Sequence, residues 1–580
     1  MPKRVGLALV LSLALPGSLS AQLAPSAPEA ASGFEAKPLA RAKKSMIAAA
    51  HPLAVDAGNA TLAAGGSAID AAIAVQLVLN LVEPQSSGIG GGAFLLHWDN
   101  TRSSIRSYDG RETAPAAIKP DLFLKSDGSP RAFDEAVFGG DSVGTPGLVA
   151  MLALAHKRHG VLPWEQLFAP AIKLAEDGFP VSARLNKLLT EMGPLKFAPN
   201  ARAYFFDEGV LPRAPGSLLK NPEFAATLRL IAAGGADAFY KGDIARAIIT
   251  ATTASPTHKG TLAETDLAGY VAKERKPVCT TYRAHRICGM GPPSSGALTV
   301  AQTLRLVAPF DLGNQPLNPQ ALHLIAEAMK LAYADRDQFI ADPDFVALPS
   351  GLLDDAYIAR RRAWIDAEKA KPKADPGEPS GLNGRRVGID ATIESVGTSH
   401  ISIIDKRGNA VALTTTIENG FGARLMAGGF LLNNELTDFS FRSVDKDGLP
   451  IANAVAPGKR PRSSMAPTIV FGPDGKLKAV LGSPGGSRII PYVIKSIVGI
   501  IDWKLDAQAA SELANFAARN GPFEIEQTVA GIMPGLHMLQ RGHKVVFPEM
   551  TSGLHIIVRR ADGTLEGGAD PRREGVARGE

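Results

Sequence analysis

The stretch GTSHISIIDKRGNAVALTTT, residues 397–416, contains two runs in which apolar and polar residues alternate. The first run covers residues 400–405 and the second covers residues 410–416, with KRGN at 406–409 between them. Alternation with a period of two is typical of a half-buried β-strand, and Gly-Asn pairs favour turns. The stretch therefore predicts a strand, a turn and a second strand, with Thr398 at the start of the first.

The segment before this pair of strands looks like a linker. Residues 371–390, KPKADPGEPSGLNGRRVGID, are dense in Pro, Gly and charge and show no apolar periodicity. We interpret 371–397 as an exposed, flexible linker that presents the Gly397-Thr398 bond. Cleavage there would free an α-amine, which titrates near 7.7 and can act as general base for the adjacent hydroxyl. A Gly-Thr pair alone is far more often an ordinary strand residue pair.

The rest of the chain has ordinary globular composition and mixes two periodicities. Of its 580 residues, 45% are hydrophobic and 21% are charged. Helices are predicted at 60–81, 147–157, 319–336, 489–501 and 507–516, and strands at 93–98, 468–471, 478–482 and 555–559. The parts of the chain before and after the linker both mix helices with strands, which indicates an α+β or α/β class with layered sheets.

The N-terminus is typical of an exported protein. Lys3-Arg4 precede an apolar run over 5–15 and small residues up to Ala21, which predicts a signal peptide over 1–21. Residues 22–40 are interpreted as a flexible lead-in. The apolar run is too short to span a bilayer, which takes ~20 residues, so we expect a secreted or periplasmic protein without a membrane span. The net charge of +5 is too small to indicate a nucleic-acid partner.

The chain has two cysteines, Cys279 and Cys288, in the alternating stretch PVCTTYRAHRICGM. A hairpin with a two-residue turn at Arg283-Ala284 would place them opposite each other, and an oxidising compartment would permit a disulfide. Arg-Ala lacks the Gly or Asn that such turns favour, which leaves the register open. No CxxC or HExxH spacing indicates a metal site, so no metal or other cofactor is expected.

Nine segments resemble one known family, in that family's order and at similar spacing. The family is the γ-glutamyltranspeptidases, which are N-terminal nucleophile hydrolases, and the resemblance covers nearly the whole mature length. The segments are EPQSSGIGGGAF (83–94), YDGRETAP (108–115), GTPG (144–147), GPPSSG (291–296), GTSHISIIDKRGNAVALTTT (397–416), LLNNELTDFS (431–440), KRPRSSMAPTIV (459–470), LGSPGGSRII (481–490) and GADPR (568–572).

The resemblance implies a four-layer αββα sandwich formed jointly by two subunits cut from one precursor. The large subunit would cover 41–397 and the small subunit 398–580, with cleavage between Gly397 and Thr398. Thr398 matches the family's nucleophile, and Thr416 matches the threonine that supports it. Gly485 and Gly486 match the pair whose backbone N–H groups stabilise the oxyanion, although PGG alone would predict only a turn.

The resemblance also implies a binding site for the two charged groups of a glutamyl donor. Arg111 matches the arginine that binds the α-carboxylate, although by itself it would be read as a surface ion-pair partner. Ser463 and Ser464 match the serines that complete that contact. The ammonium group would be bound by three acids, Glu418, Glu435 and Asp438.

Two features depart from the pattern of many family members. Many family members carry an amide side chain at position 418, at position 435 or at both. Two glutamates at these positions make this pocket more anionic than theirs. The segment 439–453 is several residues shorter than the lid-bearing loop of well-known bacterial relatives and lacks a tyrosine, which favours a site more open to large donors.

The resemblance implies a self-processing γ-glutamyltransferase that also hydrolyses glutathione and its conjugates, with water, an amino acid or a dipeptide as acceptor. A cephalosporin (glutaryl) acylase of the same fold is an alternative. Arg111, Ser463, Ser464 and Asp438 favour the glutamyl donor, because a glutaryl group has no ammonium for the acids to hold. A noncatalytic periplasmic binding protein is a third possibility, which an uncut chain of full mature mass would favour.

Overall fold

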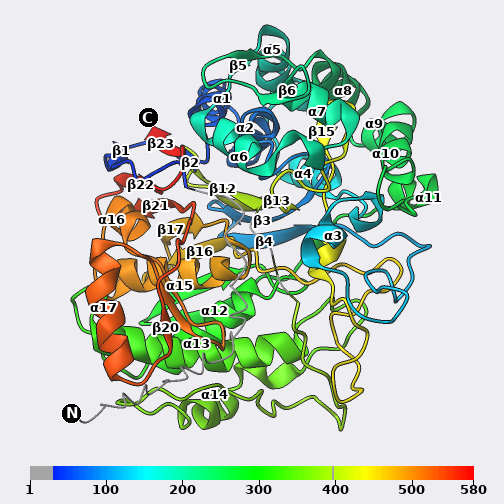
Figure 1. Cartoon of the computed structure of the whole chain (residues 1–580). Helices are drawn as coiled ribbons and strands as arrows, with labels where there is room; N and C mark the ends of the chain where they lie inside the picture. Colours follow the sequence, from blue (N-terminus) through cyan, green and yellow to red (C-terminus); the bar gives the residue numbers. More distant parts are fainter. Residues whose placement is uncertain (1–30, 393, 395–396) are drawn as a thin grey trace, which may run out of the picture.

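The computed structural model describes residues 31–392, 394 and 397–580 (Figure 1). The predicted signal peptide at 1–21 and the first part of the lead-in lie outside these residues. None of the helices in the described residues is long and apolar enough to cross a membrane.

Two seven-stranded sheets form the centre of the molecule. The first sheet contains the predicted pair of strands, β12 (Gly397–Ile404) and β13 (Ala410–Glu418), which lie side by side near its middle. Its full order is β23 (Val576–Gly579), β2 (Met46–Ala49), β12, β13, β3 (Gly92–Asp99), β4 (Ser104–Gly110) and β9 (Lys273–Arg275). Every pairing in it is antiparallel.

The second sheet is also antiparallel and is formed by strands from both ends of the chain. Its order is β1 (Ala40–Ala42), β22 (Leu565–Ala569), β21 (His555–Arg559), β17 (Leu477–Gly482), β16 (Thr468–Phe471), β11 (His285–Gly289) and β10 (Val278–Tyr282). Both sheets therefore combine strands from before residue 397 with strands from after it, and neither part of the chain could form either sheet alone.

The two sheets pack face to face, and helices cover both outer faces (Figure 1). Apolar side chains between the sheets come from both, such as Leu96 and Ala412 from the first and Ile469 and Val480 from the second. The outer face of the first sheet is covered by α1 (Pro52–Ala63), α2 (Ala68–Val82) and α4 (Leu148–His159). The outer face of the second is covered by α12 (Gly296–Val307), α13 (Pro319–Phe339), α15 (Ile489–Ile501) and α16 (Ala507–Glu512). The predicted four-layer αββα sandwich is confirmed.

Smaller elements surround these layers. The remaining helices are α3 (Phe133–Val137), α5 (Ala169–Asp177), α6 (Ala183–Met192), α7 (Pro199–Phe205), α8 (Pro222–Gly234), α9 (Asp237–Tyr240), α10 (Asp243–Thr253), α11 (Glu264–Ala268), α14 (Asp355–Arg362) and α17 (Val529–Gln540). The short strands are β5 (Phe179–Pro180), β6 (Phe206–Asp207), β7 (Leu211–Pro212), β8 (Leu218–Leu219), β14 (Met426–Ala427), β15 (Phe430–Leu431), β18 (Phe516–Ala517), β19 (Phe523–Ile525) and β20 (Val545–Val546).

Two predicted helices differ from the structure. The helix predicted at 60–81 is two helices, because Gly65 has a φ of 95° and Ser67 forms a capping box with Asp70 that starts α2. The helix predicted at 507–516 ends at Glu512, and Phe516 lies instead in the short strand β18. Helical periodicity alone does not show such breaks, which depend on local capping and on tertiary pairing.

The predicted linker at 371–397 has no helix or strand in its described part before β12, but several of its residues are held against the fold. The backbone N–H of Ala374 donates to the side chain of Asn520 at 2.8 Å, and that of Gly377 donates to Asp335 at 2.9 Å. Ala374 is also buried. The linker is therefore irregular but not exposed along its whole length, because its backbone groups find partners on neighbouring elements.

The predicted hairpin and disulfide are both present. Cys279 and Cys288 are directly opposite each other in β10 and β11, and a disulfide joins them. Arg283 and Ala284 form the two-residue turn with φ values of 49° and 63°. These positive values are the ones a type I′ hairpin turn needs, so the turn forms without Gly or Asn.

Candidate active site

The predicted nucleophile lies at the start of β12, where the strand is irregular. Thr398 pairs with Thr416 of β13, and the register shifts between Gly397 and Thr398. Such a bulge changes the direction of a side chain relative to a regular strand. Both threonines are buried, at 4% and 2% exposure. The strand register therefore brings together two hydroxyls that are 18 residues apart in sequence.

The Thr416 hydroxyl connects the nucleophile to the peptide bond before it. Thr398 Oγ1 donates to Thr416 Oγ1 at 3.3 Å, and Thr416 Oγ1 donates to the carbonyl of Gly397 at 2.6 Å. The backbone N–H of Glu418 donates to Thr416 Oγ1 at 2.8 Å, which fixes the hydroxyl from the other side. The carbonyl of the predicted cleavage site thus receives a hydrogen bond that polarises it.

A small cavity joins the predicted site residues. It is lined by all six predicted substrate-binding residues and by Thr398, Thr416 and Gly486, together with Glu394, Met465 and Ile489. Its volume is about 20 Å³, enough for one water molecule but not for a glutamyl group. The predicted residues therefore converge on one place, in a closed state in which the Gly397-Thr398 bond is intact.

Gly485 and Gly486 lie between β17 and the N-terminus of α15. Gly485 has a φ of 143° and Gly486 a φ of 54°, both of which glycine adopts without strain. A Cβ on Gly485 would lie 2.7 Å from the ring of Tyr492. The loop therefore needs glycine at Gly485 for space as well as conformation, and it brings Gly486 to the cavity that contains Thr398.

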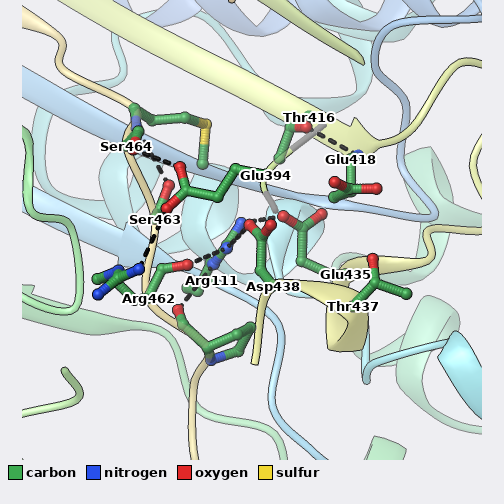
Figure 2. Close-up of polar contacts among 12 residues, drawn as sticks. Arg111, Glu394, Thr416, Glu418, Glu435, Thr437, Asp438, Arg462, Ser463 and Ser464 are labelled. Atoms are coloured by element: carbon green, nitrogen blue, oxygen red, sulfur yellow. Dashed lines mark hydrogen bonds and ion pairs between the residues drawn. The ribbon is translucent and has the colours of Figure 1, made fainter. Parts of the chain in front are cut away.

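Arg111 has its side-chain donors engaged by protein groups (Figure 2). It follows β4, is 1% exposed, and forms ion pairs with Glu435 and with Asp438, the latter at 2.5 Å. Its Nε donates to the carbonyl of Pro461 at 3.1 Å and its Nη2 to that of Arg462 at 2.8 Å. The arginine predicted for the substrate carboxylate thus contacts two of the acids predicted for the substrate ammonium.

The chain is similar to known proteins over nearly its whole length. The model of the family Gamma-glutamyltranspeptidase matches residues 54–580. The chain belongs to the γ-glutamyltranspeptidase family. It is 38% identical to the glutathione hydrolase proenzyme of Escherichia coli strain K12, over 98% of this chain and 97% of that protein. It is 36% identical to the acylase ACY 1 proenzyme of Pseudomonas sp. strain SE83, over 93% and 94% of the two chains.

Solved structures support the same fold. A cephalosporin acylase from Bacillus halodurans superposes with a TM-score of 0.81 at 28% identity, over 93% of this chain and 96% of that one. A γ-glutamyltranspeptidase chain from Helicobacter pylori superposes with a TM-score of 0.54 at 34% identity, over 58% of this chain and 95% of that one. This family member therefore shares its sandwich with proteins of both names.

The acids around Arg111 hold protons more tightly than free carboxyls do. Burial raises the pKa of Glu112 well above its usual range, and the neighbouring Glu435 raises it further. Burial likewise raises the pKa of Glu435, and it raises that of Asp438 to about 8 although Arg111 opposes the shift. One guanidinium cannot compensate this many buried carboxylates, so the cluster retains protons at neutral pH.

Glu418 lies beside this cluster and next to the threonine pair. Its side chain is buried at the end of β13 and accepts a hydrogen bond from Asn434. Its φ of 76° is unusual for a residue other than glycine. Glu418 thus contributes a backbone N–H to Thr416 and a carboxylate to the wall of the cavity.

The two predicted serines have different surroundings. Ser463 Oγ accepts from the backbone N–H of Met465 at 3.1 Å. Ser464 Oγ donates to the carboxylate of Glu394 at 2.5 Å and accepts from Arg336 Nη2 at 2.7 Å. Figure 2 shows Glu394 between Ser464 and Arg462. Ser464 therefore already binds a carboxylate in this structure.

Four residues of the site, Glu112, Arg336, Glu394 and Arg462, are not predicted from the sequence. Glu112 and Arg462 lie inside segments that carry the family resemblance, directly next to predicted residues, and that adjacency was the available signal. Arg336 lies near the end of the predicted helix over 319–336 and would have been read as an exposed charge. Glu394 lies in the irregular linker, where no pattern indicates that its side chain is buried.

The segment 439–453 is buried at both ends and partly or fully exposed over 441–450. Val444 pairs with Pro450 across a turn around Gly448, which has a φ of 74°. None of the described residues in 439–453 is among those that line the cavity. The expectation of a site more open to large donors stays a prediction.

A group with metal-ligand chemistry lies elsewhere in the described residues. His323, Glu327 and His543 are close enough to share an ion. The two imidazoles instead hydrogen-bond each other at 2.8 Å, and Lys330 pairs with Glu327 at 2.7 Å. A lysine ammonium at this position satisfies the carboxylate without a metal ion.

Proposed function

We propose that this chain is a self-processing γ-glutamyltransferase and glutathione hydrolase in which Thr398 is the nucleophile. The observation that carries the proposal is the hydrogen-bonded series Thr398, Thr416 and Gly397 carbonyl at the wall of a cavity lined by acids and serines. Membership in the γ-glutamyltranspeptidase family supports it.

Self-cleavage would start with attack of Thr398 Oγ on the carbonyl carbon of Gly397. The C–N bond to Thr398 breaks, the α-amine takes the hydroxyl proton, and an ester joins Gly397 to Thr398. Water then hydrolyses the ester. The hydrogen bond from Thr416 to the Gly397 carbonyl stabilises the negative charge that develops on this oxygen.

In the processed enzyme the α-amine of Thr398 would act as general base. It takes the hydroxyl proton as Oγ attacks the γ-amide of the donor, and it returns a proton to the departing amine. The backbone N–H groups of Gly485 and Gly486 would stabilise the tetrahedral oxyanion. Water or the amine of an amino acid or dipeptide then resolves the acyl-enzyme, which gives hydrolysis or transfer.

The charged groups of the donor would bind at the two ends of the cavity. Three acids, Glu418, Glu435 and Asp438, form one end and suit the ammonium. Ser463 and Ser464 form the other end and suit the carboxylate. Arg111 touches both ends, because it pairs with the acids and donates to the backbone that precedes the serines. No organic cofactor or metal has a role in these steps.

Processing would produce a large subunit ending at Gly397 and a small subunit over 398–580. The curated relatives from Escherichia coli and Pseudomonas carry the word proenzyme in their names, which supports a precursor that is cut. Both sheets combine strands from the two subunits, so the heterodimer would stay together. The signal peptide over 1–21 would export the chain to the periplasm or beyond.

A glutaryl acylase of the cephalosporin acylase type is the second candidate. The superposition on the Bacillus halodurans acylase over nearly the whole chain favours it. The acidic end of the cavity favours the glutamyl donor, because a glutaryl group would leave Asp438 and its neighbours without a cation. A noncatalytic binding protein would need neither the polarised Gly397 carbonyl nor the threonine pair.

The proposal is tested on purified protein by gel electrophoresis, N-terminal sequencing and assay of γ-glutamyl-p-nitroanilide with and without glycylglycine. The wild type should give two chains, the smaller starting Thr-Ser-His, and glycylglycine should accelerate release of nitroaniline. Thr398→Ala should remain one chain and be inactive. Cleavage of the alanine variant at the same bond would assign the cut to another protease and contradict the proposal.

A further inference from the structure

Helix α17 (Val529–Gln540) turns a stripe of large apolar side chains toward solvent, at the left edge of the molecule in Figure 1. Five of its side chains are 42% to 92% exposed, and their spacing of three and four residues puts them on one side of the helix. They are Val529, Ile532, Met533, Leu536 and Leu539. No other α-helix in the part of the chain that the structure describes exposes more than one large apolar side chain. A contiguous stripe of this kind indicates an interaction surface.

The opposite side of α17 packs on the molecule mainly through small residues. Gly531 and Gly535 are buried, and a Cβ on Gly535 would lie 2.4 Å from the ring of Phe547. A Cβ on Gly531 would lie 2.2 Å from the carbonyl oxygen of Glu526. Of the large apolar side chains of α17, only Met538 is buried on this side. The other five have no room there, because the helix backbone already lies close against its own chain.

The stripe is nearly symmetric about the middle of the helix. Val529 and Leu539 are each five residues from position 534, and Ile532 and Leu536 are each two residues from it. When two identical helices cross antiparallel about a two-fold axis, positions equally far from the crossing point face each other. A second α17 would therefore place leucines against Val529 and Ile532, and Met533 of both copies would lie near the axis.

The two ends of α17 carry exposed groups of opposite charge. Glu549 lies at the N-terminal end, because the backbone N–H of Gln527 donates to the carbonyl of Pro548 at 3.2 Å. Lys544 lies at the C-terminal end, next to His543, whose backbone N–H donates to a carbonyl near the end of α17 at 3.1 Å. Antiparallel pairing would bring Glu549 of each copy to Lys544 of the other, whereas parallel pairing would bring like charges together.

We propose that two copies of this chain associate through α17, antiparallel and about a two-fold axis that passes close to position 534. The apolar stripes would be buried at the centre of the interface, and the two pairs of Glu549 with Lys544 would lie at its rim. An anionic lipid surface fits the stripe less well, because it would meet Glu549 at one end. The inference goes beyond the proposed function and does not rest on it. Thr398→Ala, which stays uncut, should associate as the wild type does.

The first test measures the mass of the purified protein by sedimentation velocity over a range of concentrations. The wild type should shift to twice the mass of one copy as the concentration rises. Leu536→Glu would place two carboxylates in the apolar centre, so it should raise the dissociation constant at least about 100-fold. Leu230→Glu should associate like the wild type and is the matched control, because Leu230 is an exposed leucine of α8, far from α17 in Figure 1.

Far-UV circular dichroism should be the same for both variants and the wild type, which shows that the variants are folded. A wild type that keeps the mass of one copy at all concentrations would overturn the proposal. Binding of that single copy to phosphatidylglycerol vesicles, lost in Leu536→Glu, would then assign the stripe to a lipid surface.

The second test concerns the antiparallel arrangement. Lys544→Glu and Glu549→Lys each put like charges together at both ends of the interface, and each should raise the dissociation constant roughly two- to tenfold. The double variant Lys544→Glu/Glu549→Lys restores opposite charges, so its dissociation constant should return to about that of the wild type. A double variant as weak as the single variants would overturn the antiparallel pairing.

The third test uses a cysteine at the proposed axis. Cys279 and Cys288, the two cysteines of the chain, form a disulfide, so Met533→Cys introduces a single free thiol. Two such thiols near the axis would lie within disulfide reach, and mild oxidation should join two copies of this variant but not of Leu230→Cys. Electrophoresis without reductant measures the joined fraction. Equal joining of the two variants would reflect random collision and would contradict pairing through α17.

Discussion

The two parts of the cavity are organised by different physical means. At the threonine part, neutral hydroxyls are held by the register of β12 and β13, with Thr398 opposite Thr416. At the charged part, Arg111, Glu112, Glu435 and Asp438 are buried together, and their pairing depends on two separate segments of the chain, one after β4 and one at residues 435–438. The first arrangement follows from backbone hydrogen bonds, while the second follows from a balance between burial and charge.

The difference shows which features of the site tolerate change. A strand register is fixed by many backbone bonds, so a single side chain can be removed without moving its neighbours. In a buried charge cluster, removal of one member changes the protonation of the others. Variants at the threonine part should therefore act on one chemical step, and variants at the charged part should act on several properties together.

The largest expected effect in this comparison concerns the Thr416 hydroxyl. Thr416→Ala removes the hydrogen bond to the Gly397 carbonyl, and loss of one oxyanion donor costs roughly 100- to 1,000-fold in rate. Self-cleavage should slow by about this factor. Gel electrophoresis of samples taken over time would measure the rate. Thr415→Ala is the matched control, because adjacent strand residues point to opposite faces and Thr415 Oγ1 has no hydrogen-bond partner in the described residues. Equal slowing in both variants would mean that strand stability matters rather than the hydroxyl.

The same contrast explains what the sequence could predict. The alternation over 397–416 predicts β12 and β13, and the Cys279-Cys288 spacing predicts the hairpin, because a period of two and a turn fix both. The family resemblance predicts which residues meet in the cavity. It does not predict that Arg111 pairs with acids assigned to the opposite end of the donor. Charge pairing between distant segments leaves no periodic signal, and the burial of Glu394 in an irregular linker leaves none either.

A smaller effect is expected for Arg111→Lys. Lysine keeps the charge but cannot pair with Glu435 and Asp438 and also donate to Pro461 and Arg462. Loss of interactions worth on the order of 1.5 to 3 kcal/mol corresponds to a roughly ten- to hundredfold fall in kcat/KM, mostly through KM. Self-cleavage should be spared. 4-Aminobutyryl-p-nitroanilide keeps the ammonium of γ-glutamyl-p-nitroanilide but lacks its carboxylate. Because Arg111 contacts the acids of the ammonium end, this donor should be affected as much as γ-glutamyl-p-nitroanilide. A loss confined to the glutamyl donor would instead place the donor carboxylate on Arg111.

The smallest effect concerns the charge on Asp438. Burial and the neighbouring Glu435 raise its pKa to about 8, against Arg111, so the carboxyl is largely protonated at pH 6 to 7. A donor ammonium favours the ionised form, and binding must then release a proton. Affinity for L-glutamate should therefore rise with pH, by up to about tenfold per unit, until pH approaches 8. Calorimetry in two buffers of different ionisation enthalpy should detect the released proton at pH 6.5.

The variant Asp438→Asn distinguishes the titration of this carboxyl from that of the α-amine of Thr398. The α-amine titrates near 7.7 and remains in the variant. The amide is neutral throughout, so binding of L-glutamate should be weaker at pH 8, its pH dependence should flatten, and proton release should fall.

The pH dependence of stability gives an independent test of the charge on Asp438. The folded pKa lies above the unfolded one, so the contribution of this carboxyl to stability is complete below about pH 4 and is lost as pH rises through 8. The Tm of Asp438→Asn relative to wild type should accordingly increase between pH 5 and pH 8. A constant difference in Tm, together with unchanged proton release, would show that Asp438 is ionised throughout and that the charged part is organised by Arg111 alone.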